Sequence, residues 1–229
     1  MRWLILSLTA LLGACTISVT TYQTGDDSMD TAPATVVDFD QVVRAVRPVA
    51  VAECRKRARP GTNCDFRVVL DSNRRAAPNA YQSLDDDGRP VLTFTATLIP
   101  AMRNADELAF IISHEAAHHI SGHLIRQEEN AEKGATAFAG LATLTGGDVA
   151  EAEKLGAAVG ARNYSKEFEL EADELGTIIA YRAGFNPLVG AQFFTRIPDP
   201  GDQFLSTHPP NTARLEMVRR TAARLGMPE

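Results

Sequence analysis

The sequence has no cluster of lysine and arginine, and its 23 basic residues are outnumbered by 29 acidic ones, which gives a formal net charge of −6. An acidic chain without a basic patch offers little to the phosphates of a nucleic acid, so we expect no nucleic-acid partner. We find no internal repeat and no second domain. With 229 residues, 45% of them hydrophobic and 23% charged, the composition is that of one ordinary globular domain.

Long hydrophobic runs are also missing. The apolar run at residues 4–12 follows a single charge, Arg2, and ends in two small residues and Cys15. It is too short for a permanent transmembrane helix but is typical of an export signal. Small residues before a cysteine resemble a bacterial lipobox, so we predict that residues 1–14 are a cleaved signal peptide and that Cys15 is lipidated. The alternative is a plain signal peptide with an incidental cysteine.

The segment after Cys15 carries no apolar period. It is rich in Thr, Ser and Asp, so residues 15–35 are predicted to be a lipidated, flexible tether before a domain at residues 36–229. The residue after the cysteine is Thr16 and not Asp. By resemblance to Gram-negative lipoproteins, this favours a periplasmic protein anchored through its lipid to the outer membrane.

Cysteine is scarce, with three in the whole chain. Cys54 and Cys64 flank a short segment that contains Pro60 and Gly61. In an exported protein this pattern predicts a disulfide, the alternative being two free structural thiols. Neither cysteine lies near the histidine motif described below, so we do not propose them as metal ligands.

Hydrophobic periodicity predicts a mainly helical α+β domain with a small sheet, expected to be antiparallel. Asn104 followed by Glu107 resembles a capping box at the start of a central, buried helix. Other helices are expected at about 36–57, 126–162 with a break near 146–147, 165–183, 187–196 and 211–225, and strands at 66–70, 79–82 and 91–99.

The central helix carries the motif His114-Glu115-Ala116-Ala117-His118. On a helix, positions i and i+4 lie on one face, so the two imidazoles can bind one zinc ion. Glu115 follows the first ligand and leans toward the open side of the metal, where it can act as general base for water. Two histidines and a glutamate would be costly to bury in an apolar helix without such a partner.

A third ligand must come from elsewhere, because Ser121 and Leu124 stand where a metzincin needs Gly and His. On the helix predicted at 165–183, Glu169 and Asp173 share one face with two small residues that allow close helix packing. Glu169 is therefore the candidate third ligand, and Asp173 the candidate that orients His114. The alternative is a solvated acidic helix end, since other glutamates lie nearby.

Several segments together resemble a zinc metallopeptidase family that includes the HtpX heat-shock proteases, the CAAX prenyl endoproteases and Gram-negative periplasmic lipoprotein peptidases. The resemblance spans about residues 67–225 and rests on Asn79-Ala80-Tyr81, Asp106–Ala109, His114–His118, Tyr164–Asp173 and Ser206–Pro210. It implies a zincin-like metallopeptidase domain of the gluzincin type (HExxH plus ExxxD), with the small sheet beside the HExxH helix and Glu169 as third zinc ligand. Lys166 stands where the family often has Arg.

The resemblance also implies roles for two residues outside the helices. Asn79 would lie on a strand along the cleft and hold substrate backbone by β-augmentation, the alternative being a turn residue. His208 would reach the metal region as a reversible fourth ligand or transition-state donor, the alternative being a loop histidine at a helix N-terminus. His123, near the end of the motif helix, is predicted to lie either behind the ligands or on the surface.

The function that these residues predict is a zinc-dependent endopeptidase. By family and compartment, its substrates would be unfolded or extended proteins, namely misfolded or misassembled envelope proteins. One alternative is a non-catalytic, zinc-containing chaperone or assembly factor, although a structural zinc site needs no general base such as Glu115. Another is a metallohydrolase that acts on a non-peptide amide.

Overall fold

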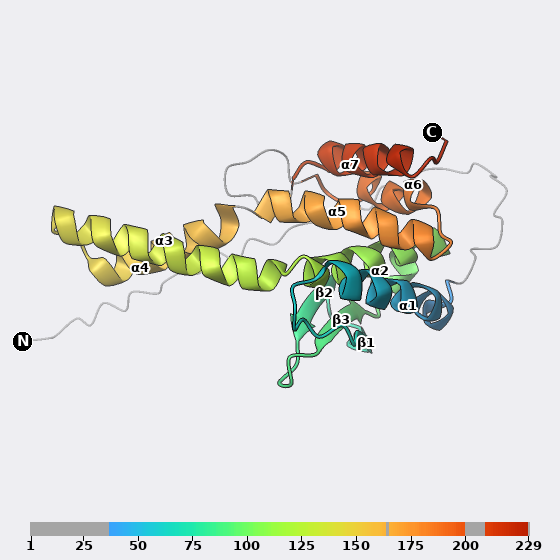
Figure 1. The fold of residues 1–229 in the computed structure, drawn as a ribbon, viewed down its shortest axis with the longest axis horizontal. Helices are drawn as coiled ribbons and strands as arrows, with labels where there is room; N and C mark the ends of the chain where they lie inside the picture. Colours follow the sequence, from blue (N-terminus) through green and yellow to red (C-terminus); the bar gives the residue numbers. More distant parts are fainter. Residues whose placement is uncertain (1–36, 164, 200–208, 229) are drawn as a thin grey trace, which may run out of the picture. The chain divides into compact units, whose positions relative to one another are not determined.

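The computed structural model describes residues 37–163, 165–199 and 209–228. The predicted signal peptide at residues 1–14, the lipidation site Cys15, the tether to residue 35, and His208 lie outside these ranges. The elements, shown in Figure 1, are α1 (Phe39–Arg57), β1 (Arg67–Asp71), β2 (Ala80–Leu84), β3 (Pro90–Thr95), η1 (Ile99–Ala101), α2 (Ala105–Ile120), α3 (His123–Thr145), α4 (Val149–Asn163), α5 (Ser165–Arg182), α6 (Pro187–Gly190), η2 (Ala191–Thr195) and α7 (Asn211–Arg224). The mainly helical α+β class is confirmed.

The three strands form a mixed sheet in the order β1-β3-β2. β3 pairs antiparallel with β2 but parallel with β1, so the expected antiparallel sheet is right for one pairing and wrong for the other. The reason is the connection after β1, which carries the chain to the far edge of the sheet before β2 begins. The turn between β2 and β3 then brings β3 back in the direction of β1. β2 is consequently an edge strand of this sheet.

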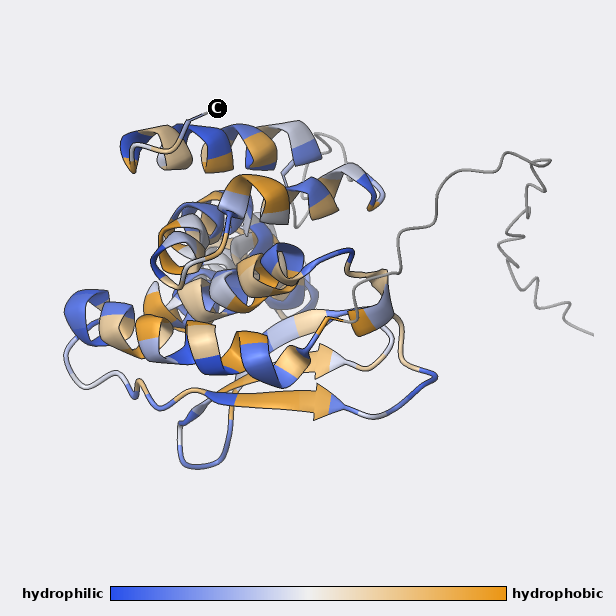
Figure 2. Ribbon diagram, turned by 90° about the vertical axis from the view of Figure 1, so that its right-hand side faces the viewer, coloured by the Kyte–Doolittle hydropathy of each residue, from blue (hydrophilic) through white to orange (hydrophobic). Residues whose placement is uncertain are grey.

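α2 is the central element, with buried residues around its whole circumference. Leu108 and Ile112 belong to a core shared with α1, the sheet and α5. Phe110, on another side, packs with Phe194 of η2 and Val218 of α7 in a second core. Figure 2 shows the strands largely in the hydrophobic colour beneath the helices. Burial on several sides fixes α2 in place, which suits a helix that carries functional side chains.

The start of α2 departs from the predicted capping box in one respect. Asn104 caps the helix as expected, since its side chain accepts the N–H of Glu107 at 2.9 Å. The Glu107 carboxylate does not return to Asn104. It accepts the N–H of Arg103 at 2.9 Å and pairs with Arg196 at 2.6 Å. A nearly inaccessible carboxylate is better stabilised by a guanidinium than by one amide, so η2 is held against α2.

α3 and α4 form a helical hairpin that extends away from the sheet (Figure 1). Their backbones touch at Gly134 and Gly156, where a methyl group would overlap the facing main chain. The break between the helices lies at Gly146, whose φ is 74°, as the sequence predicts. Within the described ranges, no helix has both the length and the apolar character needed to cross a bilayer.

A disulfide joins Cys54, in the last turn of α1, to Cys64 in the loop before β1, the pairing that the sequence predicts. By the loop-entropy model, closing a loop of this length stabilises the folded state by about 3 kcal/mol. We therefore expect a reductant to lower the free energy of unfolding by about that amount in urea denaturation. The double variant C54A/C64A is the control and should not respond to the reductant. Equal midpoints for the oxidised and reduced wild type would contradict this expectation.

Candidate metal centre

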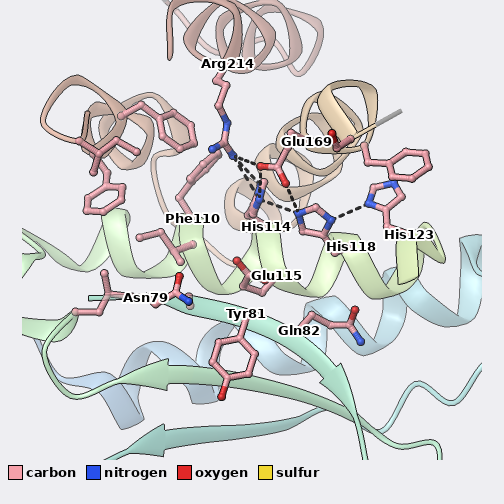
Figure 3. Close-up of a pocket in the computed structure, with 18 of the residues that line it drawn as sticks. Asn79, Tyr81, Gln82, Phe110, His114, Glu115, His118, His123, Glu169 and Arg214 are labelled. Atoms are coloured by element: carbon pink, nitrogen blue, oxygen red, sulfur yellow. Dashed lines mark hydrogen bonds and ion pairs between the residues drawn. The ribbon is translucent and has the colours of Figure 1, made fainter. Parts of the chain in front are cut away.

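α2 brings His114 and His118 together on one face of the helix. Their Nε2 atoms lie 3.0 Å apart, and their ring centroids 4.6 Å apart. Neighbouring turns of a helix place residues i and i+4 side by side, so this approach follows from the sequence spacing. The structure therefore provides two imidazole nitrogens that point at one place (Figure 3).

α5 adds Glu169 to the same place. The Glu169 Oε2 atom lies 3.5 Å from His114 Nε2, and its Oε1 atom lies 3.3 Å from His118 Nε2. α5 approaches α2 closely because residue 176 is glycine: a Cβ there would sit 3.0 Å from the backbone nitrogen of His114. The small face predicted from the sequence is thus the face that α5 turns to α2.

The three side chains fit a single metal ion. One ligand atom of each lies within 4.8 Å of the others. Zinc binds imidazole nitrogen and carboxylate oxygen at about 2.0–2.2 Å, which puts the donor atoms of a tetrahedral site about 3.3 Å apart. The separations of 3.0 to 3.5 Å in the structure match that spacing. Three protein ligands leave a position for water, as in catalytic sites.

Asp173 stands behind the first histidine. Its Oδ1 atom lies 3.0 Å from His114 Nδ1, on the side of the ring away from Glu169. Burial lowers the pKa of His114, but the hydrogen bonds that its ring donates to Asp173 and Glu169 outweigh burial and raise that pKa to about 9 in the absence of metal. A site that attracts a proton so strongly is also strongly attractive to a cation.

Arg214 of α7 is a residue that the sequence did not point to. Its Nε and Nη2 atoms donate to both oxygens of Asp173, at 2.8 and 2.7 Å, and Nη2 lies 3.4 Å from Glu169 Oε2. The guanidinium also lies 3.9 Å from the ring centre of Phe194. Arg214 thus fixes the position of the Asp173 carboxylate, which in turn contacts the His114 ring. No local pattern marks it, because its partners lie far away along the chain.

Breaking the buried pair of Arg214 and Asp173 should be costly. We expect Arg214→Met to lower the free energy of unfolding by about 3–5 kcal/mol, because it leaves the Asp173 carboxylate, which is fully buried, without its cation. Arg224→Met is the matched control, since Arg224 pairs with Glu174 at the surface, and it should cost less than about 1 kcal/mol. Urea denaturation of both variants measures the difference, and equal losses would argue against a special role for the buried pair.

The same pair should be sensitive to acid. Burial raises the pKa of Asp173, but Arg214 and His114 together lower it more, so the pKa lies below its ordinary value. A lowered pKa means that the stabilisation is complete above the ordinary carboxyl pKa of about 4 and is lost as the pH falls through the lowered value.

Two further histidines lie at the end of the motif helix. His123, the first residue of α3, is buried, with its Nδ1 atom 2.8 Å from Nδ1 of His118. Of the two positions predicted for it, the structure supports the one behind the ligands. Burial, with His118 as neighbour, lowers the pKa of His123 to about 4, so the ring is neutral near pH 7. His119 turns away and lies 2.7 Å from the carbonyl oxygen of Asn63.

Glu115 faces a cavity of about 520 Å³ beside the two histidines. In Figure 3 it lies between the histidines and β2. One wall of the cavity is polar and includes residues 79–82, which run from just before β2 into that strand. Another wall is apolar and includes Phe110, Phe193, Phe194 and Ile197. The cavity therefore joins the candidate general base to the candidate ligands and to the sheet edge.

The edge strand β2 lines this cavity and has main-chain groups that are not paired within the sheet. Asn79 pairs with Thr95, whose N–H donates to the Asn79 carbonyl oxygen at 3.0 Å. Because hydrogen-bonded and non-bonded pairs alternate in an antiparallel ladder, the main-chain groups of Ala80 and Gln82 point away from β3. Asn79 lines the cavity as predicted, but its main chain is used inside the sheet, so only its side chain is available for other contacts.

Comparison with known proteins places the chain in a family. Residues 38–222 match the model of peptidase family M48. The chain belongs to family M48. M48 peptidases are metal-dependent, which agrees with the candidate site formed by His114, His118 and Glu169. The family resemblance seen in the sequence is thereby confirmed.

Curated M48 relatives are similar over only part of their length. The chain is 29% identical over 170 residues to the mitochondrial metalloendopeptidase OMA1 of Saccharomyces cerevisiae, covering 70% of this chain and 47% of that protein. It is 33% identical over 154 residues to the putative beta-barrel assembly-enhancing protease of Vibrio cholerae, covering 60% and 32%. The beta-barrel assembly-enhancing protease of Escherichia coli is 27% identical over 141 residues, covering 52% and 28%. The M48 chain thus spans less than half the length of these relatives.

Proposed function

We propose that this M48 chain is a zinc-dependent endopeptidase of the bacterial envelope that cleaves extended segments of misfolded or misassembled proteins. The observation that carries the proposal is the placement of Glu115. It faces the same cavity as the His114, His118 and Glu169 cluster, beside an open strand edge. A metal site that only stabilised the fold would need neither a neighbouring carboxylate nor a cavity of this size.

The side chains divide the work of peptide hydrolysis. His114, His118 and Glu169 would hold the zinc ion, which would supply Lewis-acid chemistry to polarise the scissile carbonyl and acidify the attacking water. Glu115 takes the proton from the attacking water and passes it to the leaving amine. Asp173 and Arg214 hold the His114 ring in one orientation, so that its Nε2 atom stays directed at the site.

The open edge of β2 fits a substrate in extended form. Main-chain groups of Ala80 and Gln82 that do not pair with β3 can bind a peptide strand by β-augmentation. Such binding recognises the main chain of the substrate and not its side chains, which suits unfolded proteins of varied sequence. The Asn79 side chain, at the start of the strand, is proposed to hold substrate backbone as well.

A proline on this edge should separate substrate binding from folding. Ala80→Pro removes an N–H that points away from β3, so we expect KM for an unfolded protein to rise by about 10-fold while the thermal midpoint changes little. Ala80→Val keeps the N–H and is the matched control. If the proline variant and the valine variant show the same KM in steady-state assays, β-augmentation on this strand is wrong.

The proposed location rests on the N-terminal residues and on the relatives. The predicted signal peptide at 1–14 and lipidated Cys15 would export the chain and anchor it to a membrane, with the outer membrane favoured. The relatives from Vibrio cholerae and Escherichia coli are named for enhancing beta-barrel assembly, and transmembrane β-barrels belong to the outer membrane. Envelope proteins that fail to assemble are therefore the proposed substrates.

Metal content and proteolysis, measured on the same samples, test the proposal. We expect the purified chain to hold one zinc ion and to cleave unfolded casein or an unfolded outer-membrane protein. A chelator should remove both properties, and added zinc should restore both. A chain that binds zinc and unfolded protein but never cleaves it would favour the alternative, a non-catalytic chaperone or assembly factor.

A further inference from the structure

The Nδ1 atom of His118 meets another histidine, His123, whereas the Nδ1 atom of His114 meets the carboxylate of Asp173. The Nε2 atom of His118 faces His114 and Glu169, and when it binds the metal through its lone pair, Nδ1 must carry the proton of the neutral ring. That N–H points at Nδ1 of His123, 2.8 Å away, which must then accept. A neutral imidazole that accepts at one nitrogen donates at the other, so the proton of His123 sits on Nε2.

The chain of hydrogen bonds continues to a carboxylate. The Nε2 atom of His123 lies 3.2 Å from Oε2 of Glu171, which also accepts from Nη1 of Arg126 at 2.7 Å. Every donor therefore meets an acceptor, from His118 through His123 to Glu171. The direction of this chain is fixed at both ends, by the ligand nitrogen at one end and by the guanidinium at the other.

Packing fixes the His123 ring as firmly as its hydrogen bonds do. The ring stacks on Phe168 of α5, with centroids 4.6 Å apart and planes 9° apart. The Arg126 guanidinium covers the same Phe168 ring at 4.3 Å. Gly122, with φ of 67°, makes the sharp turn between α2 and α3 that brings His123 back beside His118. The turn at Gly122 and the stacking on Phe168 thus place the His123 side chain beside the candidate ligand His118.

We propose that His123 is the positioning residue of the metal ligand His118, doing for the second histidine what Asp173 does for the first. It does not touch the metal, because both its nitrogens are engaged with His118 and Glu171. The inference rests on the proposed function in one respect, that His118 is a ligand. Such partners fix the tautomer and the rotation of a ligand ring, and losing one lowers metal affinity by about 10- to 100-fold.

Zinc affinity of the full chain, measured by competition with a chelating dye, tests the proposal. His123→Phe keeps a flat ring on Phe168 but cannot accept from His118, so we expect zinc affinity to fall by about 10- to 100-fold. His123→Asn places an amide oxygen near the lost Nδ1 position and should recover part of the affinity. His119→Gln is the matched control, an adjacent histidine that does not contact a ligand, and should bind zinc like the wild type. With cobalt in place of zinc, the visible absorption bands should shift for His123→Phe and not for His119→Gln.

The outcomes separate this inference from the function on which it rests. A wild type that binds no zinc overturns both proposals. If the wild type binds zinc and His123→Phe binds it equally well, the positioning role alone is overturned. Should His123→Phe fail to fold, Glu171→Leu replaces it, since the Glu171 side chain is 45% exposed and its loss spares the core. That variant should weaken zinc binding in the same direction, and unchanged affinity would overturn the proposal.

Discussion

Glu115→Gln should lower kcat for peptide hydrolysis by about 10³-fold, within the 10²- to 10⁴-fold contribution of a positioned general base. Glutamine has the same shape, but its amide cannot take a proton from water at neutral pH. Because Glu115 is not among the three clustered donors, zinc content should stay at the wild-type level. Loss of turnover with retention of metal is the signature that separates a general base from a ligand.

The control for this variant is Glu128→Gln, a substitution at an exposed glutamate of α3. It should leave kcat, KM and zinc content unchanged. Steady-state assays with a quenched fluorescent peptide and zinc analysis of the same preparations are sufficient. Equal kcat for the Glu115 variant and the wild type would show that another group activates the water, and the enzyme mechanism proposed above would be wrong.

Glu169→Gln should have the second large effect. It should weaken metal binding, whereas Glu115→Gln removes the acceptor for the proton of the water. An amide oxygen is a weaker zinc ligand than a carboxylate, because it carries no charge to offset that of the ion. We expect zinc affinity to fall by more than about 100-fold, the upper end of what loss of an outer partner costs. Activity should fall with it and return in part at high zinc concentration.

Glu167→Gln is the matched control on the same helix, two residues away and exposed. It should change neither zinc affinity, measured by dye competition, nor proteolysis. The Glu169 variant should keep its fold, since Arg214 remains paired with Asp173. Glu169 is 9% exposed, so the structure contradicts the solvated helix end that was the alternative interpretation of the sequence. If the two variants bind zinc equally well, Glu169 is not a ligand of the metal.

The part of the site that the sequence predicted is the part encoded by local spacing. His114 and His118 share a helical face, and so do Glu169 and the glycine at 176, so the periodicity of each helix already specified which side chains turn inward. The pattern of small residues on α5 was the feature of the sequence that predicted close packing between this helix and the helix of the histidine motif. The structure shows the reason, because Gly176 is where α5 meets the backbone of His114.

What the sequence did not predict depends on tertiary packing. Arg214 pairs with Asp173, 41 residues away, and approaches His114, 100 residues away. Surface and buried arginines look alike in a helical pattern, so only the docking of α7 reveals its role. The parallel pairing of β1 with β3 was missed for a similar reason, since strand periodicity gives the buried face but not the direction of the neighbour. The roles of Cys15 and His208 stay predictions.

A crystal structure of the zinc-loaded protein, with anomalous diffraction recorded at the zinc absorption edge, tests the central claim most directly. We predict one strong anomalous peak at about 2.0–2.2 Å from Nε2 of His114, Nε2 of His118 and a carboxylate oxygen of Glu169, on the side of the cavity that Glu115 faces. An anomalous peak at other residues, or none near these three in a protein that still cleaves casein, would contradict it.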